Sequence, residues 1–398
     1  MPRPLRPHWL AVATFGTIAV LSGPAVASAA TPPVRVAASA TAPAVARLAH
    51  EVSSTAHAAA PATSALAAAV PTALASTVSA TGAATAARAG VASPTQTLAH
   101  SFYNTNNTLR AGWGLVEDGF PQTTTGLATV VNLVGRQPNF METYVHWGGG
   151  WGALTQALPF IQGTFAQGAT PVVTWLSDDP SISNESAYDL ANIANGAFDP
   201  YLISWADGLR TLGRQVFIRF DSEMNGNWSS YSIGKDGQKA ADYVNAWRHI
   251  HNVFAQQGAN NVRWVWSPNV EYTGSTPLRS LYPGDAYVDW LALDGYNWGT
   301  TNSNGWHSFA DVFFPSIADI ESISHRPVML AEVGCTEVGG SKAAWITDMF
   351  AQLKNRPDIQ AFIWFDMNKE TDWRIVSSST SAAAFAGALD ALPVRSGI

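Results

Sequence analysis

Short apolar segments recur through the C-terminal three quarters of the chain, and each runs into polar or aromatic residues. Most are rich in Val, Ile, Phe and Trp, and all are short enough to be β-strands. The eight predicted strands are 111–118, 139–147, 170–176, 215–223, 261–268, 287–296, 326–334 and 358–367.

Helix-like stretches separate most of these strands, and they cover 152–168, 200–213, 237–258 and 341–355. Two of them end at a glycine, Gly213 and Gly258, which is a common helix stop. The helix between the first two strands is poorly marked. Strand and helix alternating in this way predict an α/β fold, the (β/α)₈ TIM barrel. A doubly wound open sheet is the alternative, but no Gly-rich phosphate loop follows the first strand.

The chain before this pattern is of two other kinds. Residues 1–30 resemble a secretory signal peptide, because Arg3 and Arg6 precede an apolar run that leads to small residues. Residues 31–95 are a low-complexity Ala/Ser/Thr/Pro segment with little to bury, which predicts a disordered linker. We therefore expect a (β/α)₈ domain over 96–398 in a secreted, extracellular protein.

Composition excludes several classes of function. The net charge of −7 argues against a nucleic-acid partner. No later stretch approaches the roughly 18 apolar residues of a membrane-spanning helix, so we expect no stable membrane insertion. The single cysteine, Cys335, cannot form an internal disulfide and is predicted to be a buried, inert thiol. His249 and His251 would point in different directions on a helix, so we expect no metal and no cofactor.

Side chains that could carry chemistry gather where the predicted strands end, which is where TIM barrels place their active sites. They are Asp118, His146, Trp147, Trp175, Glu223, Trp266, Asn269, Asp294, Tyr296, Glu332 and Trp364. Carboxylates with indoles suit sugar binding, because flat aromatic faces stack on pyranose rings and polar groups bind the hydroxyls. We predict sugar contacts from His146, Trp175 and Trp298.

Two glutamates stand out in this set. Glu223 ends the fourth predicted strand and Glu332 the seventh, so a barrel places them on opposite walls of one cleft. Either alone could simply pair with Arg219 or Arg326. Together they indicate a glycosidase, which uses one carboxylic acid and one carboxylate.

Several motifs around these residues resemble glycoside hydrolase family 26. They include "TPVVTW", "RFDSEMNGNW", "VRWVWSPN", "YPGDAYVDWLALDGYNWG", "RPVMLAEVG" and "FIWFD". This clan A family consists of retaining (β/α)₈ enzymes that act on β-mannans and some other β-glycans. The resemblance implies that Glu223 is the acid/base and Glu332 the nucleophile. It also implies site roles for Arg219 in the floor, Tyr296 as a hydrogen-bond donor to the nucleophile, and Trp228 and Trp364 as aromatic walls around the sugar. We also predict that Asn225 contacts the substrate.

The sequence departs from the family pattern beside the first glutamate. Ser222 stands where the family usually has His, and Leu176 follows a Trp where Glu is frequent. Asp221 would share a strand face with Glu223 and raise the pKa of that group, or pair elsewhere. Asp178 and Asp179 are expected in a solvated loop, with sugar or cation binding as the alternative.

These observations predict a monomeric, retaining endo-β-glycosidase whose partner is a β-glycan polysaccharide, β-1,4-mannan first. The alternative substrates are β-1,3-xylan and mixed-linkage β-glucan. Two other classes stay open: a glycan-binding protein that has lost catalysis, and a structural cell-surface protein on a barrel scaffold.

Overall fold

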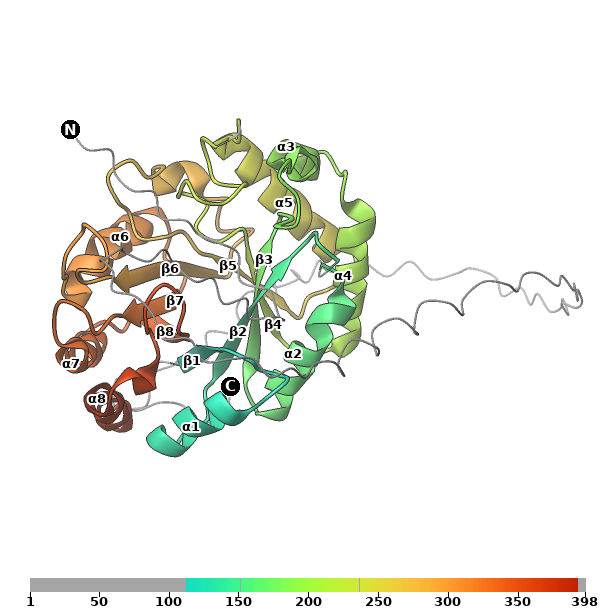
Figure 1. Ribbon diagram of the computed structural model, residues 1–398. Helices are drawn as coiled ribbons and strands as arrows, with labels where there is room; N and C mark the ends of the chain where they lie inside the picture. The colour runs from blue at the N-terminus through green and yellow to red at the C-terminus, as the bar shows by residue number, and fades with distance from the viewer. Residues whose placement is uncertain (1–111, 151, 236, 393–398) are drawn as a thin grey trace, which may run out of the picture. The chain divides into compact units, whose positions relative to one another are not determined.

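The computed structural model describes residues 112–150, 152–235 and 237–392, so the predicted signal peptide and linker lie outside the described residues. Eight parallel strands close into a barrel in chain order, and helices surround it (Figure 1). The strands are β1 (Gly112–Glu117), β2 (Phe140–His146), β3 (Thr170–Leu176), β4 (Val216–Phe220), β5 (Val262–Trp266), β6 (Trp290–Asn297), β7 (Val328–Cys335) and β8 (Ile359–Asp366). The prediction of a (β/α)₈ barrel is confirmed.

The principal helices are α1 (Thr125–Val134), α2 (Leu154–Ala166), α3 (Leu190–Ala194), α4 (Asp199–Leu212), α5 (Ala240–Gln256), α6 (Phe309–Ile323), α7 (Lys342–Leu353) and α8 (Ser379–Asp390). The poorly marked first helix is present as α1. Both α1 and α4 end at a left-handed glycine, Gly135 (φ 69°) and Gly213 (φ 64°), where a side chain would be strained.

The inside of the barrel changes from apolar to polar along the strands. Near the amino ends, the rings of Phe140, Phe217 and Trp290 pack together with centroids 5.4 and 5.8 Å apart. Side chains two residues further along a strand face the same way. In β2 and β4 these are Glu142 and Arg219, which form a charged layer above the aromatic one. The aromatic layer fills the barrel near the amino ends of the strands. The charged layer forms the floor of the space at their carboxyl ends.

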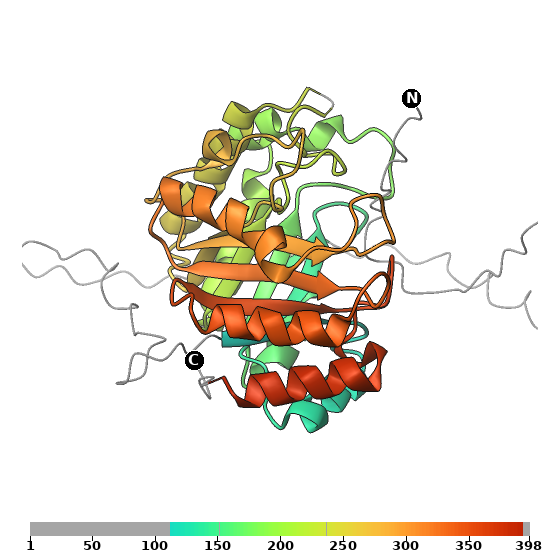
Figure 2. The ribbon, with the colours of Figure 1, turned by 90° about the vertical axis from the view of Figure 1, so that its left-hand side faces the viewer.

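The outward faces of the strands pack against the helices, and this corrects two predicted sugar contacts. Trp175 lies between two inward-facing positions of β3, so it points outward and packs on Trp205 of α4 (4.9 Å). Trp364 of β8 likewise packs on Phe385 of α8 at 5.4 Å. Both side chains are fully buried. Figure 2 shows α7 and α8 side by side.

The tryptophans of β5 follow the same rule. Trp264 and Trp266 are buried and pack on Phe254 (5.1 Å) and Tyr282 (5.1 Å), on the outer face of the strand. Val265, between them, belongs to the inner cluster. Both indoles are therefore part of the core between strands and helices, and Trp266, which was named as a strand-end candidate, does not reach the barrel interior. Trp147 is also core, with its ring 4.7 Å from that of Trp175.

Among the described residues, we find no helix long and apolar enough to cross a membrane.

Replacing Trp364 with alanine tests its assignment to the core. Trp364→Ala is expected to lower the free energy of unfolding by about 3–5 kcal/mol, since it leaves a large cavity under α7 and α8. Urea unfolding followed by circular dichroism measures this. Tyr272→Ala, which removes a side chain that is 38% exposed, is the control and should cost less than about 1 kcal/mol. Equal stabilities for the two variants would contradict the placement of Trp364.

Candidate active site

The turn after β4 presents Glu223 through an unusual backbone. β4 ends at Phe220, and Asp221 (φ 44°) and Glu223 (φ 58°) are the two non-glycine residues with positive φ in the described part. Such conformations are strained and persist where neighbours hold them. Here the Glu223 N–H donates to the carbonyl of Ser267 (2.8 Å), and the Asp221 N–H donates to that of Trp175 (3.0 Å).

This backbone separates Asp221 from Glu223, which were expected to share a strand face. The Asp221 carboxylate accepts hydrogen bonds from the N–H and the hydroxyl of Ser177, both at 2.7 Å. The idea that Asp221 raises the pKa of Glu223 is therefore wrong. Asp221 instead ties the β3 loop to the β4 turn.

Glu332 reaches the barrel interior through a β-bulge in β7. Leu330 pairs with Leu293 of β6, and Glu332 pairs with Asp294, so β7 has one extra residue at this point. The pairing with β8 shifts at the same place. Ala331 faces inward, so regular alternation would turn Glu332 toward the helices. The bulge restores the inward direction, a common device beside active sites.

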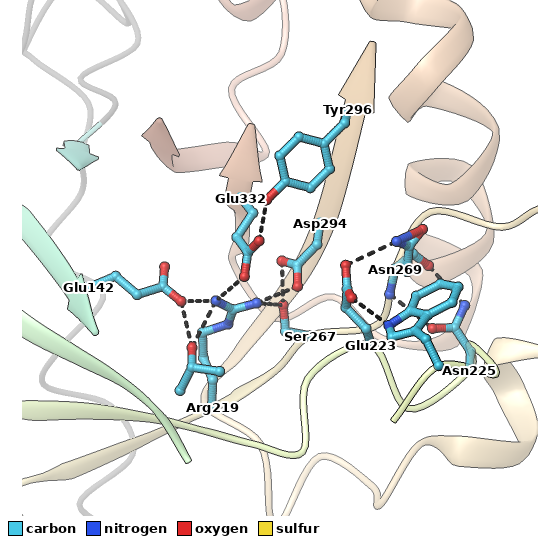
Figure 3. Close-up of polar contacts among 11 residues, drawn as sticks. Glu142, Arg219, Glu223, Asn225, Ser267, Asn269, Asp294, Tyr296 and Glu332 are labelled. Atoms are coloured by element: carbon cyan, nitrogen blue, oxygen red, sulfur yellow. Dashed lines mark hydrogen bonds and ion pairs between the residues drawn. The ribbon is translucent and has the colours of Figure 1, made fainter. Parts of the chain in front are cut away.

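Arg219 lies at the centre of the charged layer and is fully buried (Figure 3). Its guanidinium donates to Glu142, to Asp294 and to Glu332, the last at 3.2 Å. Thr174 adds a hydrogen bond to Glu142 (2.5 Å), and Ser267 adds one to Asp294 (3.0 Å). Because a buried charge is costly unless paired, this cluster holds Glu332 from below. Asp294 was among the strand-end side chains named from the sequence, whereas Glu142 was not predicted as a site residue.

Glu223 accepts two hydrogen bonds, one at each carboxylate oxygen. The Trp228 indole N–H donates to Oε2 (2.8 Å), and the Asn269 amide donates to Oε1 (3.0 Å). Burial raises the pKa of Glu223 to about 8, the charge of Glu332 adds to the rise, and the two donors oppose it. Glu223 therefore keeps its proton at neutral pH.

Asn225 was predicted to contact the sugar, but it lies behind Asn269. It is fully buried, and its amide exchanges two hydrogen bonds of 2.9 Å with the backbone N–H and carbonyl of Asn269. It orients Asn269, which in turn bonds Glu223, so the prediction that Asn225 contacts the sugar is wrong.

Glu332 and Glu223 face each other across one cavity. The Tyr296 hydroxyl donates to Glu332 Oε2, as the family resemblance implied, while Arg219 donates to Oε1 (Figure 3). One carboxylate oxygen each from Glu223, Asp294 and Glu332 lie within 4.8 Å of one another. Three carboxylates so close could attract a cation, but the Arg219 guanidinium already bonds two of them.

The cavity has a volume of about 270 Å³. Six of the predicted site residues line it: His146, Glu223, Trp228, Tyr296, Trp298 and Glu332. Ser222 lines it too, next to Glu223. Arg219 lies beneath, in the charged layer.

Several residues of the cavity wall were missed because they lie in loops or inside the barrel. Tyr144, Glu185, Lys369, Glu370 and Trp373 are among them. Trp373 follows β8 by seven residues and packs on Tyr296 (5.0 Å) and Trp298 (4.9 Å). The sequence analysis named Trp364, near the end of the eighth strand, and not Trp373 in the loop that follows.

Lys342 holds the loop that carries Trp373. Its buried ammonium donates to the carbonyls of Asp372, Trp373 and Arg374 at 3.2, 2.9 and 2.7 Å, and to the Ser377 hydroxyl. Burial lowers the pKa of Lys342 to about 8. This lysine therefore fixes the loop behind Tyr296 and Trp298.

Of the three remaining aspartates, Asp178 lines the cavity, whereas Asp179 and Asp118 do not. Asp178 is not simply solvated: it lies 2.5 Å from Nδ1 of His146 and lines the cavity. Asp179 is buried and accepts from Ser181. Asp118 is exposed and outside the cavity wall.

The cysteine and the histidine pair behave as predicted. Cys335 is buried, and burial raises its pKa to about 12, as expected for an inert thiol. His249 pairs with Asp199 (2.6 Å), whereas His251 packs on Tyr287 (5.2 Å).

Residues 142–325 match the model of glycosyl hydrolase family 26. Endoglucanase H of Acetivibrio thermocellus is 34% identical over 265 residues, which is 65% of this chain and 28% of that protein. The chain belongs to glycoside hydrolase family 26. A mannan endo-1,4-β-mannosidase of Caldalkalibacillus mannanilyticus is 35% identical over 142 residues, 33% of this chain and 25% of that protein. The chain thus spans about a quarter of the length of these relatives.

The barrel of this family 26 chain is also similar to solved structures. One is a β-mannanase from a symbiotic protist of the termite Reticulitermes speratus, complexed with gluco-manno-oligosaccharide. The TM-score is 0.52 with 18% identity, and the match covers 72% of this chain and 91% of that one. At this identity the likeness concerns the fold alone.

The raised pKa of Glu223 gives a test that does not depend on activity. Glu332→Gln removes the neighbouring negative charge and should lower the pKa of Glu223. Infrared difference spectra of the carboxyl band, or NMR of ¹³C-labelled glutamate, follow the titration. Glu321→Gln, at the surface pair with Arg356 (3.1 Å), is the control and should leave Glu223 unchanged. An unshifted Glu223 in Glu332→Gln would contradict the coupling.

Proposed function

We propose that this barrel is a retaining endo-β-glycosidase that hydrolyses β-1,4-mannan. The observation that carries the proposal is the distance between the two facing carboxyl groups, whose oxygens approach within 4.8 Å. Retaining glycosidases need roughly 5–5.5 Å between the groups, and inverting enzymes need roughly 6.5–9.5 Å to admit a water molecule.

In the first step, a Glu332 oxygen attacks the anomeric carbon while Glu223 gives its proton to the glycosidic oxygen. The bond to the leaving sugar breaks, and a covalent glycosyl-enzyme forms. Arg219 and Tyr296 each donate a hydrogen bond to Glu332, and together they hold its carboxyl group toward the cavity for this attack. Because its pKa is raised, Glu223 still carries the proton that it gives to the glycosidic oxygen.

In the second step, Glu223 acts as a base. It takes a proton from a water molecule, the water oxygen attacks the anomeric carbon, and Glu332 leaves as a carboxylate. The sugar keeps its β configuration after two inversions. Trp228 and Asn269 donate to Glu223 throughout, so the group stays in place as its charge changes.

The names of two relatives support a mannan or a glucan as the substrate, since one is an endoglucanase and the other a mannan endo-1,4-β-mannosidase. Two further relatives, 27% and 26% identical, are β-1,3-xylanases, which keeps β-1,3-xylan as an alternative. Mannan and glucan differ at the C2 hydroxyl, close to the reacting carbon. Ser222 lines the cavity beside Glu223, where the family usually has His. Hydrolysis of a panel of β-1,4-mannan, mixed-linkage β-glucan and β-1,3-xylan decides among the substrates, with starch as the negative control.

A secreted protein suits this activity, because a polysaccharide does not cross a membrane. We propose a leader over 1–30, a linker over 31–95, a catalytic domain over 96–398 and an extracellular monomer. Export from a secreting host, with the mass of the mature chain, tests the leader, and light scattering tests the oligomeric state. The paired carboxyl groups favour an enzyme over a sugar-binding protein that has lost catalysis.

Glu332→Ala should reduce turnover on the order of 10⁴-fold or more, since it removes the nucleophile. Azide should restore part of the activity by entering the vacated space, and the product is then the α-glycosyl azide. NMR of the product identifies the anomer. Glu321→Ala serves as the control. If Glu332→Ala retained full activity on the glycans cleaved by the wild type, the proposed roles would be wrong.

The pH profile tests the role of Glu223 separately. kcat/KM should fall as pH rises through about 8, because the general acid loses its proton. Trp228→Phe removes a donor that lowers this pKa, so the alkaline limb should move to higher pH. Initial rates on the best polysaccharide of the panel give both profiles. An alkaline limb that Trp228→Phe leaves in place would assign the limb to another group.

A further inference from the structure

Tyr272 extends the active site beyond the cavity that holds the two glutamates. It lies in the loop between β5 and β6, and its ring stacks on that of Trp228, with centroids 5.8 Å apart and planes at 28°. Trp228 is the residue whose indole N–H bonds Glu223 at 2.8 Å. One ring therefore separates Tyr272 from the proposed acid/base.

The Tyr272 side chain is accessible from solvent. It is 38% exposed, one of three large apolar side chains that are exposed in the described part of the chain. It does not line the cavity between Glu223 and Glu332. Burial raises the pKa of its hydroxyl and the charge of Glu223 adds to the rise, whereas the Tyr296 hydroxyl bonds Glu332. Tyr272 thus lies on the Glu223 side of the site.

The loop holds this ring in place. The Ser275 N–H donates to the Tyr272 carbonyl (2.9 Å), and the next N–H, from Thr276, donates to the Asn225 carbonyl (3.0 Å). On the other side, the Glu271 N–H donates to the hydroxyl of Ser316 (2.7 Å). A ring fixed before the ligand arrives loses little conformational entropy on binding.

Because Tyr272 lies on the Glu223 side of the site, its position determines which sugar unit of the substrate its ring can contact. The acid/base protonates the oxygen of the leaving sugar, so that sugar must lie beside Glu223. Aromatic faces stack on the C–H faces of sugar rings. We infer that Tyr272, with Trp228, forms a binding subsite for the sugar units on the leaving-group side of the cleaved bond. The inference rests on the proposed function.

A purely structural role is the rival interpretation, in which Tyr272 only supports Trp228. The two roles differ in what a substitution changes. Loss of a support would disturb Trp228 and so Glu223, which moves the alkaline limb of kcat/KM and slows every cleavage alike. Loss of a sugar platform would spare that limb and change which bond of an oligosaccharide is cleaved.

The experiment uses the pentasaccharide that the wild type cleaves fastest, β-1,4-mannopentaose or cellopentaose, labelled with ¹⁸O at its reducing end. Mass spectrometry of the products gives the frequency of cleavage at each bond. Tyr272→Ala should shift cleavage toward the reducing end, because binding modes that place several sugars on the leaving side become weaker. It should lower kcat/KM about tenfold, and Tyr272→Phe and Tyr272→Trp should restore the wild-type pattern.

A binding measurement separates this inference from the proposed function. In the Glu332→Ala background, Tyr272→Ala should raise the Kd of the same two pentasaccharides about tenfold, as followed by tryptophan fluorescence. That result supports the subsite even if the wild type cleaves no glycan, which would overturn the proposed function alone. An unchanged bond pattern and unchanged Kd would overturn the subsite alone. If Tyr272→Ala moved the alkaline limb of kcat/KM and left the frequency of cleavage at each bond unchanged, Tyr272 would only support Trp228, and the subsite would be wrong.

Discussion

The buried guanidinium of Arg219 is the interaction on which the site depends. A charge of this size inside a barrel costs several kcal/mol unless it is paired. Its partners come from β2, β6 and β7, through Glu142, Asp294 and Glu332. Three strands must therefore hold their register around β4 for the charge to be neutralised. The same contacts fix one oxygen of Glu332 and leave its carboxylate directed at the cavity.

The aromatic layer below makes this arrangement possible. Phe140, Phe217 and Trp290 close the barrel, so that the charged layer is sealed from that end. The carboxyl groups of the charged layer are buried, and electrostatic interactions gain strength where water is excluded. The rise in the pKa of Glu223 is a consequence, since burial is its largest cause.

Two departures from regular strand geometry bring the glutamates together. The left-handed turn at Glu223 and the extra residue of β7 at Ala331 each redirect a side chain. Both are held by neighbours: the turn by the Ser267 carbonyl, the bulge by pairing with β6 and β8. The two groups then acquire different surroundings. Glu223 receives an indole and an amide, and Glu332 receives a guanidinium and a phenol, which suits one proton donor and one carboxylate.

The sequence by itself determined the alternation of strands and helices, the closed barrel and the position of Glu223 and Glu332 at the ends of strands four and seven. These follow from local apolar patterns and from the rule that parallel barrels carry their chemistry at one end. Only the tertiary structure decided which side chains face inward. Trp175 and Trp364 look like sugar platforms in the sequence, yet strand parity turns them to the helices. Glu142, Asp294, Trp373 and Tyr272 enter the site through contacts between segments far apart in the chain. A local pattern gives the period of a strand, but its phase is set by bulges, turns and buried charges that form only when the barrel closes.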